Sequence, residues 1–240
     1  MIGQEAGKNF AYVLGVFLGD GCVTLRNVEG ETPKLYFRLN TIDEDFARAV
    51  KVALEELTSG YTVTIGQHSV SKSSKPNWYL AHGDHAICER LVSDTEQKAV
   101  IPSYVFGWPR DLKLAFIAGL MDSEGFVAAN SNHTGRRFYM GFKSCDLWVP
   151  DFVRLLQSVG IMVGKIGIEK PRKPGHKIPM RFAIKMQSWI DSGARFNIAR
   201  KQQRVDEWAA TEPDPRGLRF RAKLASETTR QTPVEKLVMT

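Results

Sequence analysis

Two apolar runs that end in an acid and a glycine divide the chain into similar halves. The runs are YVLGVFLGDG at residues 12–21 and FIAGLMDSEG at residues 116–125. Apolar residues fill successive turns of each run, which is typical of a helix buried on most of its faces. Glu124 follows Asp20 by 104 residues in a chain of 240 residues. This spacing predicts an internal duplication.

The residues after each run repeat one order of elements. Alternation of apolar and polar positions predicts strands, and apolar positions three and four apart predict helices. The order is helix, strand, strand, helix, strand, strand, helix, so the predicted fold is α+β with two αββαββα halves. Strands are predicted at 34–40, 61–67, 77–81, 126–132, 136–143, 163–170 and 179–186, and further helices at 43–60, 84–94, 147–160 and 199–210.

Proline and charge mark the boundaries between the predicted segments. Pro102 and Pro109 limit helix in the connection between the halves, because proline lacks the amide hydrogen that a helix interior needs. The end of the chain is basic and contains proline. The predicted segments are an N-terminal half (1–95), a linker (96–112), a C-terminal half (113–211) and a basic C-terminal tail (212–240).

Both apolar runs carry small residues four positions apart. Such positions share one helix face, and small side chains there let two helix backbones approach closely. If the two helices pack along these faces, their C-terminal ends bring Asp20 and Glu124 together. The small residues are Gly15, Gly19, Gly119 and Ser123.

Two acids placed together at helix C-termini are unfavourable without a ligand. Their charges repel each other and the negative ends of the helix dipoles. A divalent cation removes this conflict, and Mg²⁺ commonly takes one or two carboxylates together with phosphate oxygens. Asp20 and Glu124 are therefore the first candidates for metal ligands.

The charge balance favours a polyanionic partner. The chain has 33 Lys and Arg against 26 Asp and Glu, a net charge of +7 and a pI near 9.3. A surplus of this kind is typical of nucleic-acid binding, although solvated charge alone produces it in other proteins.

Cysteine usage and hydropathy indicate an intracellular, reducing setting. Cys22, Cys88 and Cys145 are widely spaced and odd in number, which argues against a disulfide framework and a zinc ribbon. The N-terminus lacks the pattern of a signal peptide, and no apolar run is long enough to span a membrane. We expect a protein that is not secreted, in the cytoplasm or nucleoid or in an organelle with its own genome.

The segments VLGVFLGDG (13–21) and IAGLMDSEG (117–125) together resemble the paired signature of LAGLIDADG homing endonucleases, in the single-chain form with two motifs. The resemblance extends over residues 9–208. The first copy departs from the pattern at Leu18, where the second copy keeps Asp122. The last acid of the motif is present in both copies.

The resemblance implies a pseudo-twofold, monomeric, intron-encoded enzyme in which two antiparallel sheets form a saddle over DNA around two packed central helices. Asp20 and Glu124, together with Gly19 and Ser123 in the same metal site, would hold Mg²⁺ against one phosphodiester in each strand across the minor groove. The product is a staggered double-strand break in a long recognition site. Mn²⁺ would substitute for Mg²⁺, and Ca²⁺ would support binding without cleavage.

The family also carries a basic residue near each metal site. TEQKAVIP points to Lys98, and NIARKQQR points to Lys201, with Arg200 close behind. A lysine there could stabilise the charge that develops on the phosphoryl group or orient water, although both could also be solvated side chains. Asn40 and Ser144 end the second strand of each half and are candidates for positioning water.

The polar faces of the predicted strands carry the candidates for reading DNA. Arginine and lysine read guanine edges, asparagine and glutamine read adenine, and others hold phosphates. A solvated sheet face would also alternate, but it would mix in more acids than Glu169 alone. The candidates are Thr24, Arg26, Lys34, Tyr36, Arg38, Thr62, Thr64, Asn77, Arg137, Tyr139, Lys143, Lys165, Arg181 and Lys185.

Three functions stay open from sequence. The first is a site-specific double-strand DNA endonuclease that uses a divalent metal. The second is an intron RNA maturase on the same fold, and the third is a catalytically silent DNA-binding protein. Both metal-site acids are present, which favours the nuclease because RNA binding does not need them.

Overall fold

The computed structural model describes most of the chain. Residues 1–205 form one compact unit, and residues 206–240 form a second, of which only the end of one helix is described. The predicted basic tail at 212–240 lies outside the described residues. The described residues are 4–27, 32–58, 60–68, 77–132, 135–170 and 177–211.

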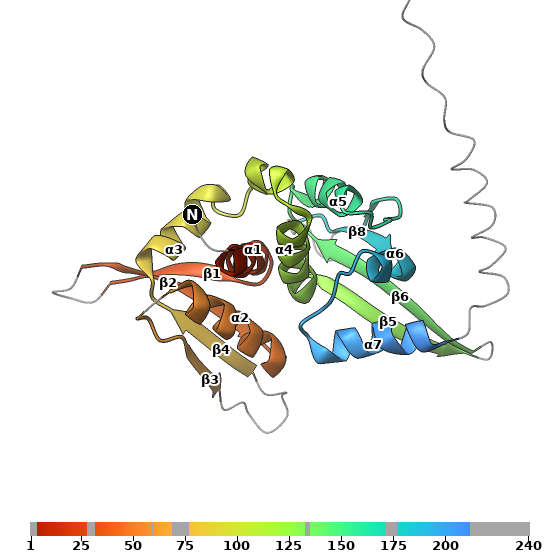
Figure 1. Cartoon of the computed structure of the whole chain (residues 1–240), viewed down its shortest axis with the longest axis horizontal. Coiled ribbons are helices and arrows are strands. Elements are labelled where there is room, and N and C mark those ends of the chain that lie inside the picture. The colour runs from red at the N-terminus through yellow and green to blue at the C-terminus, as the bar shows by residue number, and fades with distance from the viewer. Residues whose placement is uncertain are drawn as a thin grey trace, which may run out of the picture. The chain divides into compact units, whose positions relative to one another are not determined.

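Both halves contain the predicted order of elements (Figure 1). The first half consists of α1 (Gln4–Leu18), β1 (Cys22–Arg26), β2 (Lys34–Thr41), α2 (Glu44–Leu57), β3 (Thr64–His68), β4 (Asn77–His82) and α3 (His85–Asp94). A short 3₁₀ helix, η1 (Ser103–Gly107), lies in the connection. The second half consists of α4 (Arg110–Ser123), β5 (Gly125–Asn132), β6 (Gly135–Ser144), α5 (Val149–Ser158), β7 (Gly167–Ile168), β8 (Met180–Ile184), α6 (Met186–Asp191) and α7 (Ala199–Ala210).

Each half forms one four-stranded antiparallel sheet with the same topology. The strand orders are β1-β2-β4-β3 and β5-β6-β8-β7, and every paired neighbour is antiparallel. Equivalent strands occupy equivalent places, as a duplication requires. The predicted fold class is confirmed.

The inner faces of the sheets form the core. Phe37 and Leu39 of β2 are buried, while Arg38 between them is exposed, because successive side chains of a strand point to opposite faces. In the second half Phe142 of β6 lies 4.7 Å from Phe152 of α5, between ring centroids. We call the opposite faces, which carry Arg38 in one sheet and Lys143 in the other, the outer faces.

The two apolar helices α1 and α4 pack closely against each other (Figure 1). A Cβ built on Gly15 would lie 2.2 Å from the carbonyl oxygen of Phe116. A Cβ built on Gly119 would lie 2.2 Å from the carbonyl oxygen of Tyr12. Real Cβ atoms do not approach oxygen this closely, so only glycine fits these crossings. The predicted contact along the small residues is confirmed.

Details at the sheet edges differ from the sequence prediction. The strand predicted at 61–67 begins only at Thr64, so Tyr61 lies before β3 and is 49% exposed. β7 contains only two residues, and its Ile168 is 76% exposed. Edge strands are paired on one side only, and their alternation weakens where they leave the sheet.

Two helices also differ from the sequence prediction. The helix α6 was not predicted, and α4 begins inside the predicted linker.

Among the described residues, no helix has the length and apolarity needed to cross a membrane.

Candidate active site at the ends of the central helices

The two motif acids lie at the C-terminal ends of the packed helices. Asp20 follows α1, and Glu124 is the residue after α4. A Cβ built on Gly19 would lie 2.3 Å from Ser123 Cβ and 3.6 Å from Glu124 Cγ. The close crossing of the helices therefore places the Glu124 side chain beside the residue that precedes Asp20.

Neither carboxylate has a protein partner among the described residues. No hydrogen bond or ion pair within that part of the chain reaches the side chain of Asp20 or Glu124. Asp20 is exposed and Glu124 is half-buried, so both are open to a ligand. Carboxylates in folded proteins are usually satisfied by donors or solvent, and an accessible unpartnered pair is an arrangement suited to a cation.

The surroundings of both acids disfavour negative charge. Loss of water contact raises the pKa of Asp20, an effect that Lys201 and Lys98 partly offset. Loss of water contact, together with the charges of Asp20 and Asp146, raises the pKa of Glu124 to about 7, although Lys98 and Lys201 oppose this shift. The pKa of Glu124 thus responds to the negative charge of Asp20, as expected for like charges at one site.

Lys98 holds the end of α1. Its Nζ donates to the carbonyl oxygens of Gly19 and, at 3.1 Å, Gly21, the residues on either side of Asp20. A cation at a helix C-terminus satisfies carbonyls that have no partner within the helix. Lys98 is half-buried, so it can face both the helix end and a ligand.

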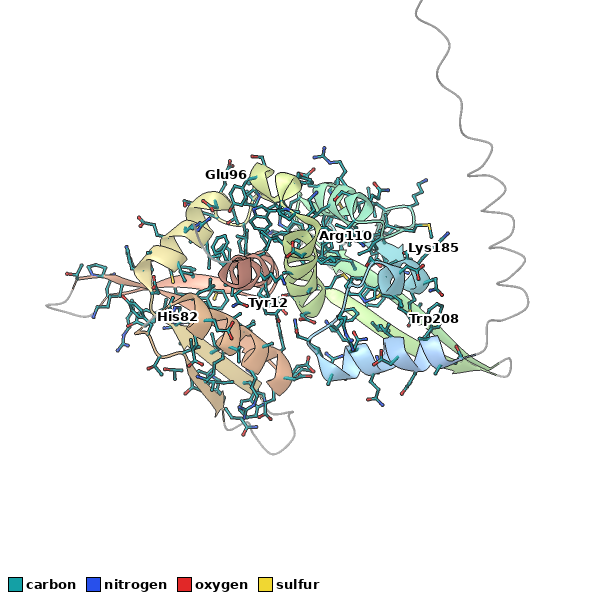
Figure 2. All side chains as sticks on the ribbon, viewed as in Figure 1. Tyr12, His82, Glu96, Arg110, Lys185 and Trp208 are labelled. Carbon is teal, nitrogen blue, oxygen red and sulfur yellow. The ribbon has the colours of Figure 1, made fainter. Side chains whose placement is uncertain are left out.

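The turn that carries Lys98 is strained. The φ angles of Glu96, Gln97 and Lys98 are 49°, 58° and 71°, in the left-handed region that residues other than glycine rarely adopt. Thr95 supports this turn, because its hydroxyl accepts from the Lys98 amide at 3.0 Å and donates to the Leu91 carbonyl at 2.7 Å. Figure 2 labels Glu96 in this connection after α3. Strain of this kind is concentrated at functional sites.

Lys201 holds the end of α4 in a related way. Its Nζ donates to the carbonyl oxygens of Met121 at 3.0 Å and Asp122 at 2.6 Å. The side chain is buried, and burial lowers the pKa of Lys201 to about 8. Lys201 is therefore more enclosed than Lys98.

Asp122 connects the helix pair to the segment before α7. It is 1% exposed and accepts from the Tyr12 hydroxyl at 3.0 Å and the Asn197 side-chain amide at 3.0 Å. The backbone amides of Asn197 and Ile198 also donate to it. Burial raises the pKa of Asp122 to about 6, although these donors lower it. Figure 2 labels Tyr12 on α1, beside α4.

A cavity adjoins Asp20. Its volume is about 410 Å³. Arg200 lies on its wall and forms a two-point ion pair with Asp43, at 2.5 and 2.7 Å. This pair links the second half to the first. The other lining residues with polar side chains include Asn40, Ser123 and Lys201.

Three of the remaining candidates, Gly19, Ser123 and Ser144, have partners within the protein. The Gly19 carbonyl accepts from Lys98, and the Ser123 hydroxyl donates to the Gly119 carbonyl at 3.0 Å. The Ser144 hydroxyl donates to Asp146 at 2.7 Å. Asn40 is exposed at the end of β2. Within the described residues, no group of three or more His, Cys, Asp and Glu has a geometry that holds a metal ion.

Residues 7–99 match the family described as LAGLIDADG-like domain. This part of the chain is similar to the LAGLIDADG family. The match covers the first motif and its sheet, and the second half of the chain repeats that fold.

Two curated relatives align with much of this chain. The uncharacterized protein MJ0398 of Methanocaldococcus jannaschii is 26% identical over 201 residues, which are 84% of this chain and 65% of that protein. The ribonucleoside-diphosphate reductase NrdEB subunit alpha of Bacillus subtilis is 22% identical over 178 residues, which are 66% of this chain and 15% of the reductase. The chain spans less than two thirds of the length of either relative.

Solved structures share the LAGLIDADG fold. I-DmoI in complex with DNA and Ca matches with a TM-score of 0.54 at 16% identity, over 78% of this chain and 88% of that chain. An I-DmoI variant in complex with its target DNA in the presence of Mg matches with a TM-score of 0.53 at 15% identity, over 79% of this chain and 97% of that chain. At this identity the likeness establishes the fold.

The predicted DNA-reading residues of the first half lie mainly on one face. Thr24 pairs with Tyr36, Arg26 with Lys34, and Cys22 with Arg38, and paired residues of antiparallel strands share a face. Thr64 and Asn77 lie on β3 and β4, whereas Thr62 precedes β3.

The equivalent residues of the second half are more dispersed. Tyr139 and Lys143 lie on β6, and Arg181 lies on β8 opposite Lys143. Lys165 precedes β7, and Lys185 is the N-cap of α6. The backbone of Arg137 belongs to β6, but its side chain lies outside the described residues.

Several residues of the site were not singled out from sequence. Asp43 and Asp146 follow the second strand of each half, and Asn197 precedes α7. Asn197 is the first residue of the NIARKQQR segment, in which only Lys201 and Arg200 were selected. Asp43 and Asp146 lie in no recognisable motif, and their positions shortly after β2 and β6 were the available signal.

Proposed function

We propose that this chain is a site-specific DNA endonuclease that uses a divalent metal to hydrolyse one phosphodiester in each strand, leaving a staggered double-strand break. The observation that carries the proposal is the pair of accessible acids, Asp20 and Glu124, at the crossing of α1 and α4 without a protein partner among the described residues. I-DmoI, a homing endonuclease with this fold, supports it. We infer that the chain acts as a monomer, since both motif acids come from one polypeptide.

The acids present fit a magnesium ion. The site offers two carboxylates that repel each other, and within the described residues there is no third acidic or histidine ligand. Mg²⁺ prefers few protein ligands, with water and phosphate oxygens completing its coordination. Asp20 and Glu124 would hold the ion, which polarises a phosphoryl oxygen and lowers the pKa of bound water. I-DmoI has been solved with DNA in the presence of Ca, Mn and Mg, which supports Mn²⁺ and Ca²⁺ as substitutes in binding.

The two lysines have related tasks. Lys98 and Lys201 fix the ends of α1 and α4, so they keep the acids at a constant separation. Each also supplies positive charge near an acid of the other half, because Lys201 is the stronger cationic influence on Asp20 and Lys98 on Glu124. We infer two unequal sites, one with Asp20, Asn40 and Lys201 and one with Glu124 and Lys98.

The deciding experiment is cleavage of a plasmid library that carries random inserts, with and without Mg²⁺. A nuclease produces linear molecules with fixed ends from a subset of inserts, only when metal is present. A catalytically silent DNA-binding protein retains specific inserts on a filter but leaves every plasmid intact. An RNA maturase shows neither selective retention nor cutting of duplex DNA. The last two outcomes contradict the proposal.

DNA affinity should fall steeply with salt. If the exposed Arg26, Lys34 and Arg38 and their counterparts contact phosphates, each contact changes the log–log slope by about −0.9. We expect a slope of several units, measured by fluorescence anisotropy from about 50 to 200 mM salt. A slope near zero would remove DNA as the partner.

Replacement of each lysine should affect the two strands unequally. Lys98→Met is expected to slow one strand's cut more than the other's, and Lys201→Met to do the reverse, because each lysine is the stronger cationic influence on a different acid. Loss of one such contact typically costs about 10²–10³ in rate. A time course on supercoiled plasmid with each strand end-labelled should therefore show nicked DNA before linear DNA.

The control for both lysine variants is thermal unfolding. Lys201→Met removes the donor from two carbonyls in a buried place, which typically costs about 1–3 kcal/mol, so its rates are compared below its melting range. Equal slowing of both strands by both variants would show that the lysines act on binding or on helix position alone.

A further inference from the structure

A charged cluster lies on the outer face of the second sheet. Glu169 accepts from Lys143 Nζ at 2.6 Å through one carboxylate oxygen and from Arg181 Nη1 at 3.0 Å through the other. We call these three residues the Lys143–Glu169–Arg181 cluster. The two carboxylate oxygens of Glu169 thus accept from two different side chains, one on β6 and one on β8.

The backbone fixes the cluster. Lys143 and Arg181 are directly opposite in the β6–β8 ladder, and the Glu169 amide donates to the Pro179 carbonyl at 2.9 Å, one step beyond the β7–β8 pairs. Gly167 pairs with Arg181, and Glu169, two residues later, shares its face. All three side chains therefore share the outer face.

Glu169 changes how Lys143 and Arg181 can interact with DNA. Like charges directly opposite on neighbouring strands repel, and Glu169 removes that repulsion while it restricts their rotamers. Its own charge repels phosphate. Lysine and arginine held in this way are better suited to the acceptors of a guanine edge than to the DNA backbone.

We propose that Glu169 is a specificity-determining residue, which holds Lys143 and Arg181 as one unit that reads a guanine-containing step of the DNA target in the major groove. A two-stranded β-ribbon fits that groove. The inference rests on the proposed function, because it requires duplex DNA as the ligand. It predicts that the base preference at one or two adjacent positions of the target depends on Glu169, although Glu169 itself contacts no phosphate.

The test is selection of binding sites from a random duplex library in Ca²⁺, with sequencing of the bound DNA. Glu169→Gln should lose base preference at one or two adjacent positions by about 5- to 150-fold, the range for a good base contact, and keep its preference elsewhere. Lys143→Gln and Arg181→Gln should lose preference at the same positions. Glu169→Asp keeps the charge but shortens the reach, so it should also lose preference there.

The matched control is Asp151→Asn. Asp151 forms an ion pair with Arg154 at 2.6 Å on α5, and α5 packs against the inner face through Phe152. This variant removes the same charge from the other side of the sheet and should leave every base preference unchanged.

The outcomes separate the inference from the proposed function. If the wild-type chain selects a sequence but Glu169→Gln keeps the same profile, or binds all DNA more tightly without a positional change, Glu169 is only a surface ion-pair partner and the inference is wrong. If the wild-type chain selects no sequence and its affinity does not depend on salt, the proposed function fails as well.

Discussion

Asp20→Asn and Glu124→Gln are each expected to abolish metal-dependent DNA cleavage while DNA binding persists. Both changes keep the shape of the side chain and remove one charge from the pair that faces the ion. A metal supplies several kcal/mol of charge stabilisation, and at about 1.4 kcal/mol per tenfold in rate we expect a loss of about 10³-fold or more. Because the acids lie at one helix crossing, each change should impair both strand cuts.

The measurement is single-turnover cleavage of end-labelled DNA, together with binding by anisotropy in Ca²⁺. Glu89→Gln is the matched control, since Glu89 is an exposed acid on α3 away from the helix crossing. Binding should be unchanged or slightly tighter in the two active-site variants, because a negative charge near DNA is removed. Full cutting by either single variant would disprove a site that uses both carboxylates.

Gly119→Ala is expected to destabilise the protein more than most single substitutions. The added methyl carbon would lie 2.2 Å from the Tyr12 carbonyl oxygen and 2.8 Å from the Val16 nitrogen. These are backbone atoms of α1 and cannot rotate away, so the helices must separate. Overpacking typically costs about 1–3 kcal/mol, occasionally more, and we expect the upper end despite the better helix propensity of alanine.

Thermal unfolding checks this prediction, with Gly107→Ala as the control. Nothing lies within 4 Å of a Cβ built on Gly107, so that variant should melt like the wild type. For a chain of this size 1 kcal/mol shifts the melting temperature by about 2–4 °C, which gives a decrease of about 6–12 °C for Gly119→Ala. Cleavage by the folded fraction should also fall, because separated helices move Asp20 away from Glu124. Equal melting temperatures would contradict the close packing of α1 and α4.

Local pattern was sufficient for the two halves and their helices and strands. The alternation around Phe37 and Phe142 places both residues in the core, because a period of two allows only one face of a strand to be buried. The small residues four apart predicted the α1–α4 contact, since helix periodicity fixes which side chains share a face. At the sheet edges the pattern was weaker, and the strand predicted at 61–67 begins only at Thr64.

Sequence by itself therefore determined the duplicated fold, the packing of the central helices and the choice of Asp20 and Glu124 as candidate ligands, because these follow from periodicity within short segments. Only the tertiary structure decided which distant groups meet. The left-handed turn that aims Lys98 at the end of α1, the burial of Lys201, the Asp43–Arg200 pair and the Lys143–Glu169–Arg181 cluster each join residues from separate elements. Such contacts depend on how the elements pack. They also depend on which charges and backbone groups become buried and therefore need a hydrogen-bond partner.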